Sequence, residues 1–164
     1  MNNRQQLKTF ETYENHKGFY NEKNVYKALR KIHYSDFFEE FDDNEFPYDT
    51  AADFLCGSCD IFAISLSELL NYSAYIISGK TEKSFHAFCQ IYKNRQRYFV
   101  DVRGITTDFS EFMKDVNEFV DGEYTVRPLL EEDVKSWETD SYFRKEGYGF
   151  AKAIINKYKC CYTL

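Results

Sequence analysis

The sequence has little proline and glycine and no long hydrophobic run. It contains 2 Pro and 7 Gly among 164 residues, which excludes a collagen-like repeat. No apolar segment approaches the ~20 residues that a helix needs to cross a bilayer. The first residues are polar and are not followed by the apolar stretch of a signal peptide. We therefore expect a cytoplasmic location (the host-cell cytoplasm if the source is a phage or pathogen), with reduced thiols and no disulfide framework.

An excess of basic residues is also missing. The formal net charge is −6 and the isoelectric point is near 5.2, which argues against nucleic-acid binding because phosphate contacts need a basic surface. Hydrophobic residues make up 43% and charged residues 29% of the chain, which excludes a disordered tail. The length predicts a single domain over residues 1–164, with a polar surface arm over 1–22. The high Asn, Lys, Tyr and Phe content is typical of bacterial or phage proteins.

Aromatic residues and cysteines are plentiful by contrast. Phe, Tyr and Trp together account for 19% of the residues, and we interpret most of them as core packing. The cysteines fall into three groups: Cys56 with Cys59, Cys89 alone, and Cys160 with Cys161.

The last four residues, Cys-Tyr-Thr-Leu, match a prenylation motif that would attach a lipid at Cys161. The alternative interpretation is an ordinary helix end.

The hydrophobic pattern predicts an α+β domain. Apolar spacing indicates a helix over 23–41. An acidic stretch over 36–53 holds eight acids and no base, and its second half, 42–50, is expected to be a loop. A helix buried nearly all round is predicted from Ser58 to Leu70, with Ser58 as its N-cap.

Further strands and helices are expected after the buried helix. Strands are predicted over 73–78, 85–92, 97–102 and 123–126, and helices over 109–120, 131–138 and 150–158. The order indicates a buried helix packed on an antiparallel sheet with flanking helices.

Cys59 lies in the first turn of the buried helix. Unpaired N–H groups and the helix dipole at this position lower the pKa of a thiol and favour the nucleophilic thiolate. Asp60 would oppose thiolate formation if its side chain pointed the same way. The alternative is that Cys59 is an inert, small apolar residue.

A hairpin brings a histidine and an aspartate together. A tight turn at Lys93-Asn94 would place His86 directly opposite Asp101, with both side chains on one face and Cys89 on the other. A carboxylate beside an imidazole fixes its tautomer and stabilises the imidazolium, as nucleophilic catalysis requires. The alternatives are that His86 is a core histidine and that Asp101 pairs with Arg103.

This order of residues resembles the papain-like and transglutaminase-like cysteine enzymes. Cys56-Gly57-Ser58-Cys59 is similar to the papain-type nucleophile signature. Asp60 stands where that signature has Trp or Tyr. The 15 residues from His86 to Asp101 fit the transglutaminase-like layout better, and arylamine N-acetyltransferases have a comparable arrangement.

The resemblance covers residues 53–105 and implies thiol-based acyl chemistry. It suggests a hydrolase or acyltransferase, such as a protease, amidase or deamidase, acting on a protein or peptide substrate without a cofactor. The implied triad is Cys59, His86 and Asp101, with a thioester intermediate.

Several groups could stabilise the oxyanion in such a reaction. The backbone N–H of Cys59 is the first candidate, because the helix N-terminus directs it at the site. Asp53, at the position of the papain-type oxyanion glutamine, Ser58 and Gln90 are the side-chain candidates.

Three other functions compete with this interpretation. A zinc site could use Cys56, Cys59, His86 and Cys89, although residues three apart on a strand point to opposite faces, so no metal is expected. A Cys-x-x-Cys thiol oxidoreductase is a second alternative, but that motif should follow a strand. The third is a catalytically silent member of the fold that binds a basic protein partner through its acidic segment 36–53.

Overall fold

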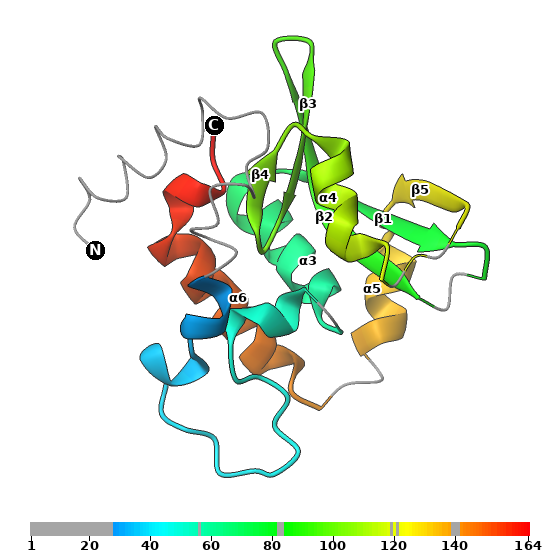
Figure 1. The fold of residues 1–164 in the computed structure, drawn as a ribbon. Helices are drawn as coiled ribbons and strands as arrows, with labels where there is room; N and C mark the ends of the chain where they lie inside the picture. The colour runs from blue at the N-terminus through cyan, green and yellow to red at the C-terminus, as the bar shows by residue number, and fades with distance from the viewer. Residues whose placement is uncertain (1–27, 56, 82–83, 119, 121, 139–141) are drawn as a thin grey trace.

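The computed structural model describes residues 28–55, 57–81, 84–118, 120, 122–138 and 142–164, so the predicted arm over 1–22 lies outside the described residues. The fold is α+β, as predicted, with a five-stranded antiparallel sheet in the order β4-β3-β2-β1-β5 (Figure 1). The strands are β1 (Ser73–Gly79), β2 (Phe85–Lys93), β3 (Gln96–Asp101), β4 (Gly104–Thr106) and β5 (Tyr124–Pro128).

Helices cover both faces of this sheet. They are α3 (Cys59–Leu70), α4 (Phe109–Val116), α5 (Glu131–Glu138) and α6 (Arg144–Lys157). Helix α3 packs on one face, where the Cys89 thiol donates a hydrogen bond to the Ala63 carbonyl at 3.3 Å. Helix α4 covers the other face, where the ring of Phe112 lies 4.8 Å from that of Phe88. We call these the α3 face and the α4 face.

Helix α3 is the buried helix that the sequence predicts. Its apolar side chains occur on all sides, and it lies between the sheet and α6 (Figure 1). It ends at Asn71, whose left-handed backbone (φ 58°) stops the helix. Ser58 is at the N-cap position as predicted, but its hydroxyl makes no capping hydrogen bond. The Ser58 side chain is instead a hydrogen-bond partner of Tyr48.

Among the described residues, the helix predicted over 23–41 does not continue past Ala28. Residues from 29 onward form two short 3₁₀ turns, Leu29–Lys31 and Tyr34–Asp36. The chain between them is extended, and the Ile32 carbonyl accepts a hydrogen bond from the Ala51 amide at 2.9 Å. Pairing with a distant segment replaces helical hydrogen bonds here, although the apolar residues are buried as expected. The predicted loop over 42–50 is confirmed.

The β2–β3 hairpin differs from its prediction by two residues in register. Lys93 pairs with Gln96, so the turn residues are Asn94 and Arg95 rather than Lys93 and Asn94. Both turn residues have positive φ, 52° and 62°, as a type I′ turn requires. A shift by two residues changes every partner but leaves each side chain on its predicted face.

Other boundaries differ more modestly. Strand β4 was not predicted; it begins at Gly104 (φ 115°) and is separated from the end of β3 by two residues. Helix α6 begins at Arg144 rather than at residue 150, and α4 is shorter than predicted. Asp108 caps α4 as its side chain accepts a hydrogen bond from the Glu111 amide.

The end of the chain packs into the core. Cys161 and Tyr162 are 6% and 0% exposed; Cys161 ends a 3₁₀ turn, Lys159–Cys161, and Tyr162 follows it. Lipid attachment at Cys161 would require this segment to leave the core. Among the residues that the structure describes, no helix combines the length and apolar character needed to cross a membrane.

Candidate active site

The Cys59 thiol lies against the peptide groups on either side of His86. As the first residue of α3, Cys59 places its Sγ 3.3 Å from the Ala87 amide, which donates to it. The thiol in turn donates to the Phe85 carbonyl at 3.9 Å. These two contacts hold the sulfur against the main chain of β2 at His86.

This contact occupies an opening between two strands. The paired residues of β2 and β3 extend from the turn to Cys89 and Val100 and no further. The Ala87 amide lies beyond that point, and its hydrogen bond goes to sulfur rather than to a carbonyl of β3. The N-terminus of α3 thus closes the sheet where the strands separate.

His86 and Asp101 form the predicted pair despite the change in register. Nε2 of His86 lies 2.9 Å from an Asp101 carboxylate oxygen, and the two side chains are 0% and 3% exposed. The imidazole ring is parallel to the ring of Phe88 and lies 5.8 Å from that of Phe112. Because Asp101 binds Nε2, the atom that can exchange a proton with a nucleophile is Nδ1.

Arg103 is the residue that sequence reasoning undervalued. Its buried guanidinium donates to Asp101 at 2.6 Å from Nη2 and to Asp115 at 2.8 Å from Nη1. It also donates to the Phe112 carbonyl at 3.1 Å. Pairing of Asp101 with Arg103 appears in the sequence analysis as an alternative to pairing with His86, whereas the structure contains both.

This arrangement keeps Asp101 ionised. Burial alone would raise the pKa of its carboxyl group, but the positive charge of Arg103 and the hydrogen bonds from His86 and Arg103 hold that pKa well below its ordinary value. Asp101 therefore accepts hydrogen bonds from both partners at neutral pH.

The thiol of Cys59 is not activated in this closed arrangement, contrary to the expectation from its place in the helix. Burial raises its pKa to about 12, and the charge of Asp60 adds to this effect. The backbone N–H groups of Ala87, Asp60 and Cys59 act in the opposite direction. The helix terminus has the predicted effect on the thiol, but the loss of water outweighs it.

Asp60 is directed toward α6 by an ion pair. Its carboxylate accepts a hydrogen bond from Arg144 at 2.9 Å, and Arg144 also donates to the Tyr148 hydroxyl at 3.1 Å. The residue that replaces the aromatic of the papain-type signature thus joins two helices.

The side chains predicted to assist the oxyanion are not brought together. The Asp53 carboxylate accepts hydrogen bonds from the amides of Asp49 and Thr50 at 2.8 and 2.9 Å, so it caps a 3₁₀ turn. Gln90 shares the α4 face with His86 but lies four residues farther along β2, about 13 Å away at the usual rise per residue.

The competing chemical functions receive little support. His86 and Cys89 point to opposite faces, as predicted, and the described residues contain no group of three His, Cys, Asp or Glu side chains able to hold a metal. In the described chain a 3₁₀ turn, Ala51–Phe54, precedes α3 where a thioredoxin-like motif would have a strand. Cys56 itself lies outside the described residues.

Comparison with known proteins identifies no relative. No family model, curated protein or solved structure matches this chain.

Proposed function

We propose that this protein is a cysteine-dependent hydrolase or acyltransferase acting on an amide or ester bond, with Cys59 as nucleophile, His86 as base and Asp101 as orienting group. The observation that supports it most strongly is the position of the Cys59 sulfur against the two peptide groups that flank His86. The buried His86–Asp101 hydrogen bond is the second support.

The proposed reaction proceeds through a thioester. The Cys59 thiol gives its proton to Nδ1 of His86 as sulfur attacks the substrate carbonyl carbon. The imidazolium then protonates the leaving amine or alcohol as the carbon–nitrogen or carbon–oxygen bond breaks. Water or an amine next gives a proton to His86 and attacks the thioester. The departing sulfur recovers its proton from His86.

The surrounding groups would assist each step. Asp101 stabilises the imidazolium, and Arg103 keeps that carboxylate ionised and fixed in place. The backbone N–H groups of Cys59 and Asp60, which already lower the pKa of the thiol, are the nearest donors for the oxyanion. Proton transfer to His86 at the moment of attack removes the need for a standing thiolate.

Alkylation of individual thiols tests the proposal, with Cys89 as the matched control. Cys89 is also buried, its pKa is also raised by burial, and its sulfur bonds a backbone carbonyl of α3 on the face opposite His86. We expect iodoacetamide near pH 7 to label Cys59 about tenfold faster than Cys89, because the proposed mechanism lets only Cys59 transfer its proton to His86. Mass spectrometry of the digested protein measures both rates.

The His86→Ala variant completes this test. It should reduce the labelling of Cys59 to the rate of Cys89 and leave Cys89 unchanged. Equal rates for the two thiols in the unmodified protein, or a Cys59 rate that does not respond to His86→Ala, would contradict the proposal.

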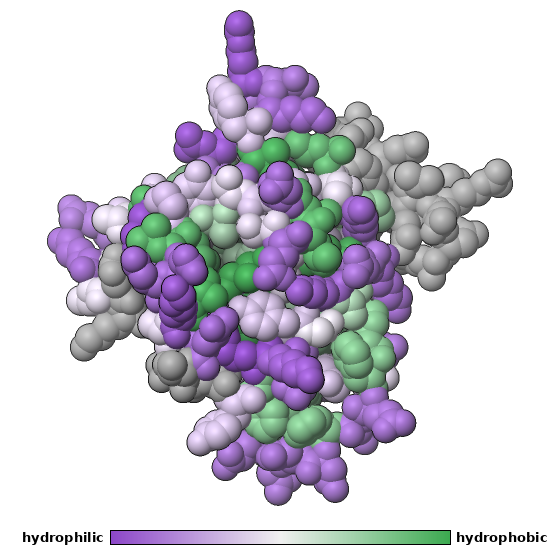
Figure 2. Space-filling model, turned by 180° about the vertical axis from the view of Figure 1, so that it is seen from behind, coloured by the Kyte–Doolittle hydropathy of each residue, from purple (hydrophilic) through white to green (hydrophobic). Residues whose placement is uncertain are grey.

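A second candidate function is a catalytically silent protein that binds a basic partner. The nearly complete burial of Cys59 and His86 favours it, as does the surface of residues 36–53, where Phe38 and Phe41 are 39% and 42% exposed among acidic side chains. In Figure 2 a group of hydrophobic side chains appears at the lower end of the molecule, where this segment lies.

The two functions differ in their dependence on sulfur. A binding module would keep full affinity for a lysine-rich peptide after Cys59→Ser and lose it after charge reversal at Glu39 and Glu40. The proposed enzyme would lose all turnover with Cys59→Ser.

A further inference from the structure

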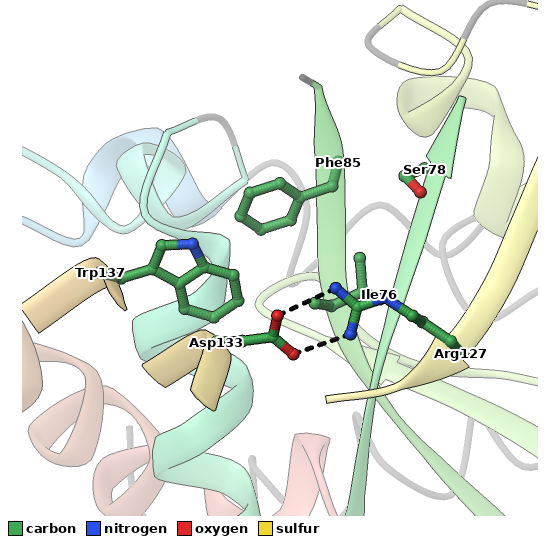
Figure 3. A pocket seen from close by; sticks show the side chains of 6 residues that line it. All are labelled: Ile76, Ser78, Phe85, Arg127, Asp133 and Trp137. Atoms are coloured by element: carbon green, nitrogen blue, oxygen red, sulfur yellow. Dashed lines mark hydrogen bonds and ion pairs between the residues drawn. The ribbon is translucent and has the colours of Figure 1, made fainter. Parts of the chain in front are cut away.

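A pocket lies on the α3 face of the sheet, beneath α5. Its volume is about 180 Å³, and Figure 3 shows its six lining side chains directed toward a common space. They come from β1, β2, β5 and α5: Ile76, Ser78, Phe85, Arg127, Asp133 and Trp137.

Phe85 connects this pocket to the proposed nucleophile. Its ring forms part of the pocket wall, and its carbonyl oxygen accepts the hydrogen bond of the Cys59 thiol. The pocket is also on the sheet face that α3 covers, since Phe85 and Cys89 alternate to the same side of β2. A substrate bound at Cys59 would therefore have this pocket beside it.

The wall of the pocket is aromatic and is formed in part by a weakly attached helix. The rings of Phe85 and Trp137 are stacked with centroids 5.0 Å apart and planes 14° apart. Helix α5 has no buried residue, and the Trp137–Phe85 stack and the Arg127–Asp133 ion pair connect it to the sheet. An apolar group entering the pocket would contact these two rings.

The polar groups of the pocket carry no net charge. The Arg127 guanidinium donates to both carboxylate oxygens of Asp133, at 2.7 and 2.9 Å. Asp133 also accepts from the Leu130 amide at 2.8 Å. A charged ligand would have to compete with this two-bond pair for one of its members, whereas an uncharged ligand leaves the pair intact.

We propose that this pocket is the substrate side-chain subsite and that it selects acyl donors with an uncharged aromatic or aliphatic side chain over donors with a charged one. The inference rests on the proposed function for its link to Cys59. The aromatic wall supplies apolar contact, and the closed ion pair rejects both signs of charge.

Fluorescence titration tests this selection without catalysis. Trp137 is the single tryptophan of the chain, so its emission reports directly on the pocket. The probes are the N-acetyl methylamides of phenylalanine, leucine, aspartate and lysine, added to the Cys59→Ala protein. We expect saturable changes with the first two and about tenfold weaker binding of the charged pair.

A variant that changes the charge of the pocket tests the same selection more directly than the choice of probes. Asp133→Asn removes the negative charge that pairs with Arg127 in the pocket and keeps an oxygen that can accept from the Leu130 amide. It should improve binding of the aspartate derivative about tenfold and leave the lysine derivative weak. Lys135→Gln is the control on the same helix, since the ammonium group of Lys135 is exposed and pairs with Glu131, and it should change neither affinity.

The outcomes separate this inference from the proposed function. Equal binding of charged and uncharged probes, no saturable change with any probe, or no response to Asp133→Asn overturns the pocket assignment, whatever the reactivity of Cys59. Selective binding together with an unreactive Cys59 supports the pocket and contradicts the proposed chemistry.

Discussion

A single buried arginine determines the charge state of the candidate site. Arg103 lies between Asp101 and Asp115 and is itself fully buried. Burying this positive charge is tolerable because its carboxylate partners, above all the buried Asp101, replace the water that it loses. Arg103 therefore influences the orientation of His86 through Asp101, which binds both residues.

Replacement of this arginine should destabilise the fold and change its acid sensitivity. Arg103→Met leaves Asp101 buried without its guanidinium, and we expect a loss of about 3–5 kcal/mol in the free energy of unfolding. Asp115→Asn is the control, with a smaller loss, because Asp115 is 28% exposed and Arg103 keeps Asp101. Urea unfolding measures both.

The pH dependence follows from the lowered pKa of Asp101. Its folded pKa is below the unfolded value of about 3.9, so its contribution to stability is present above about pH 4 and is lost as the pH falls below that. In Arg103→Met burial dominates and the pKa rises, so the dependence below about pH 4 should become shallower. An unchanged slope would show that Arg103 does not set this pKa.

The sequence predicts the catalytic candidates better than their surroundings. Alternation along a strand places His86 and Asp101 on one face, and this survives a two-residue error in register because the side-chain period is two. The full burial of Arg103 could not be predicted, since it depends on α4 reaching the sheet with Phe112 and Asp115. The raised pKa of Cys59 could not be predicted either, because it results from the removal of water from the thiol when the core packs.

Helices α3 and α6 approach closely at a glycine. A Cβ built on Gly147 would lie 2.7 Å from Cζ of Tyr48 and 3.0 Å from Cδ1 of Ile61. Both neighbours are buried, so neither can move away without disturbing the core. Gly147 thus permits a contact between α6, α3 and the segment that precedes α3.

Alanine substitutions at two nearby glycines of α6 should change the stability of the protein in opposite directions. Gly147→Ala gains helix propensity but overpacks the contact, and we expect a net loss of about 1–3 kcal/mol. Gly149→Ala is the matched control, because its Cβ would meet only Phe38, at 3.7 Å, and it should gain about 0.5–1 kcal/mol. Thermal unfolding distinguishes the two variants: the unfolding temperature should fall for Gly147→Ala and rise for Gly149→Ala. A change of the same sign in both would contradict the packing argument.

Whole elements were predicted where local pattern and tertiary environment agree. Helix α5 has its predicted bounds, and the N-cap position of α3 is Ser58, as predicted. The segment after residue 28 has apolar spacing typical of a helix, but its backbone pairs with residues 49–51. A short apolar spacing cannot reveal such a long-range pairing.

At the scale of the molecule, the last residues of the chain join both sides of the core. The Tyr162 hydroxyl donates to the Val102 carbonyl at 2.9 Å, and the Tyr72 hydroxyl donates to the Tyr162 carbonyl at the same distance. Val102 lies between β3 and β4, and Tyr72 lies between α3 and β1. The C-terminal segment therefore holds the sheet and α3 together.

Removal of one hydroxyl should measure this connection. Tyr162→Phe leaves the buried Val102 carbonyl without that donor, and we expect a loss of about 1–3 kcal/mol in unfolding free energy. Tyr92→Phe, at a side chain 72% exposed, should have no measurable effect. Equal stability of the two variants in urea unfolding would show that the Tyr162 hydroxyl does not hold the sheet.

The sulfur of Cys59 has a further consequence for β2. Because the Ala87 amide donates to that sulfur rather than to a neighbouring strand, its protection from hydrogen exchange depends on the atom that we propose as the nucleophile. A bound acyl group would draw electron density from the sulfur and weaken this acceptor, and removal of the acyl group would restore it. The exchange rate of one backbone amide would thus follow the turnover of the site without any label on the substrate.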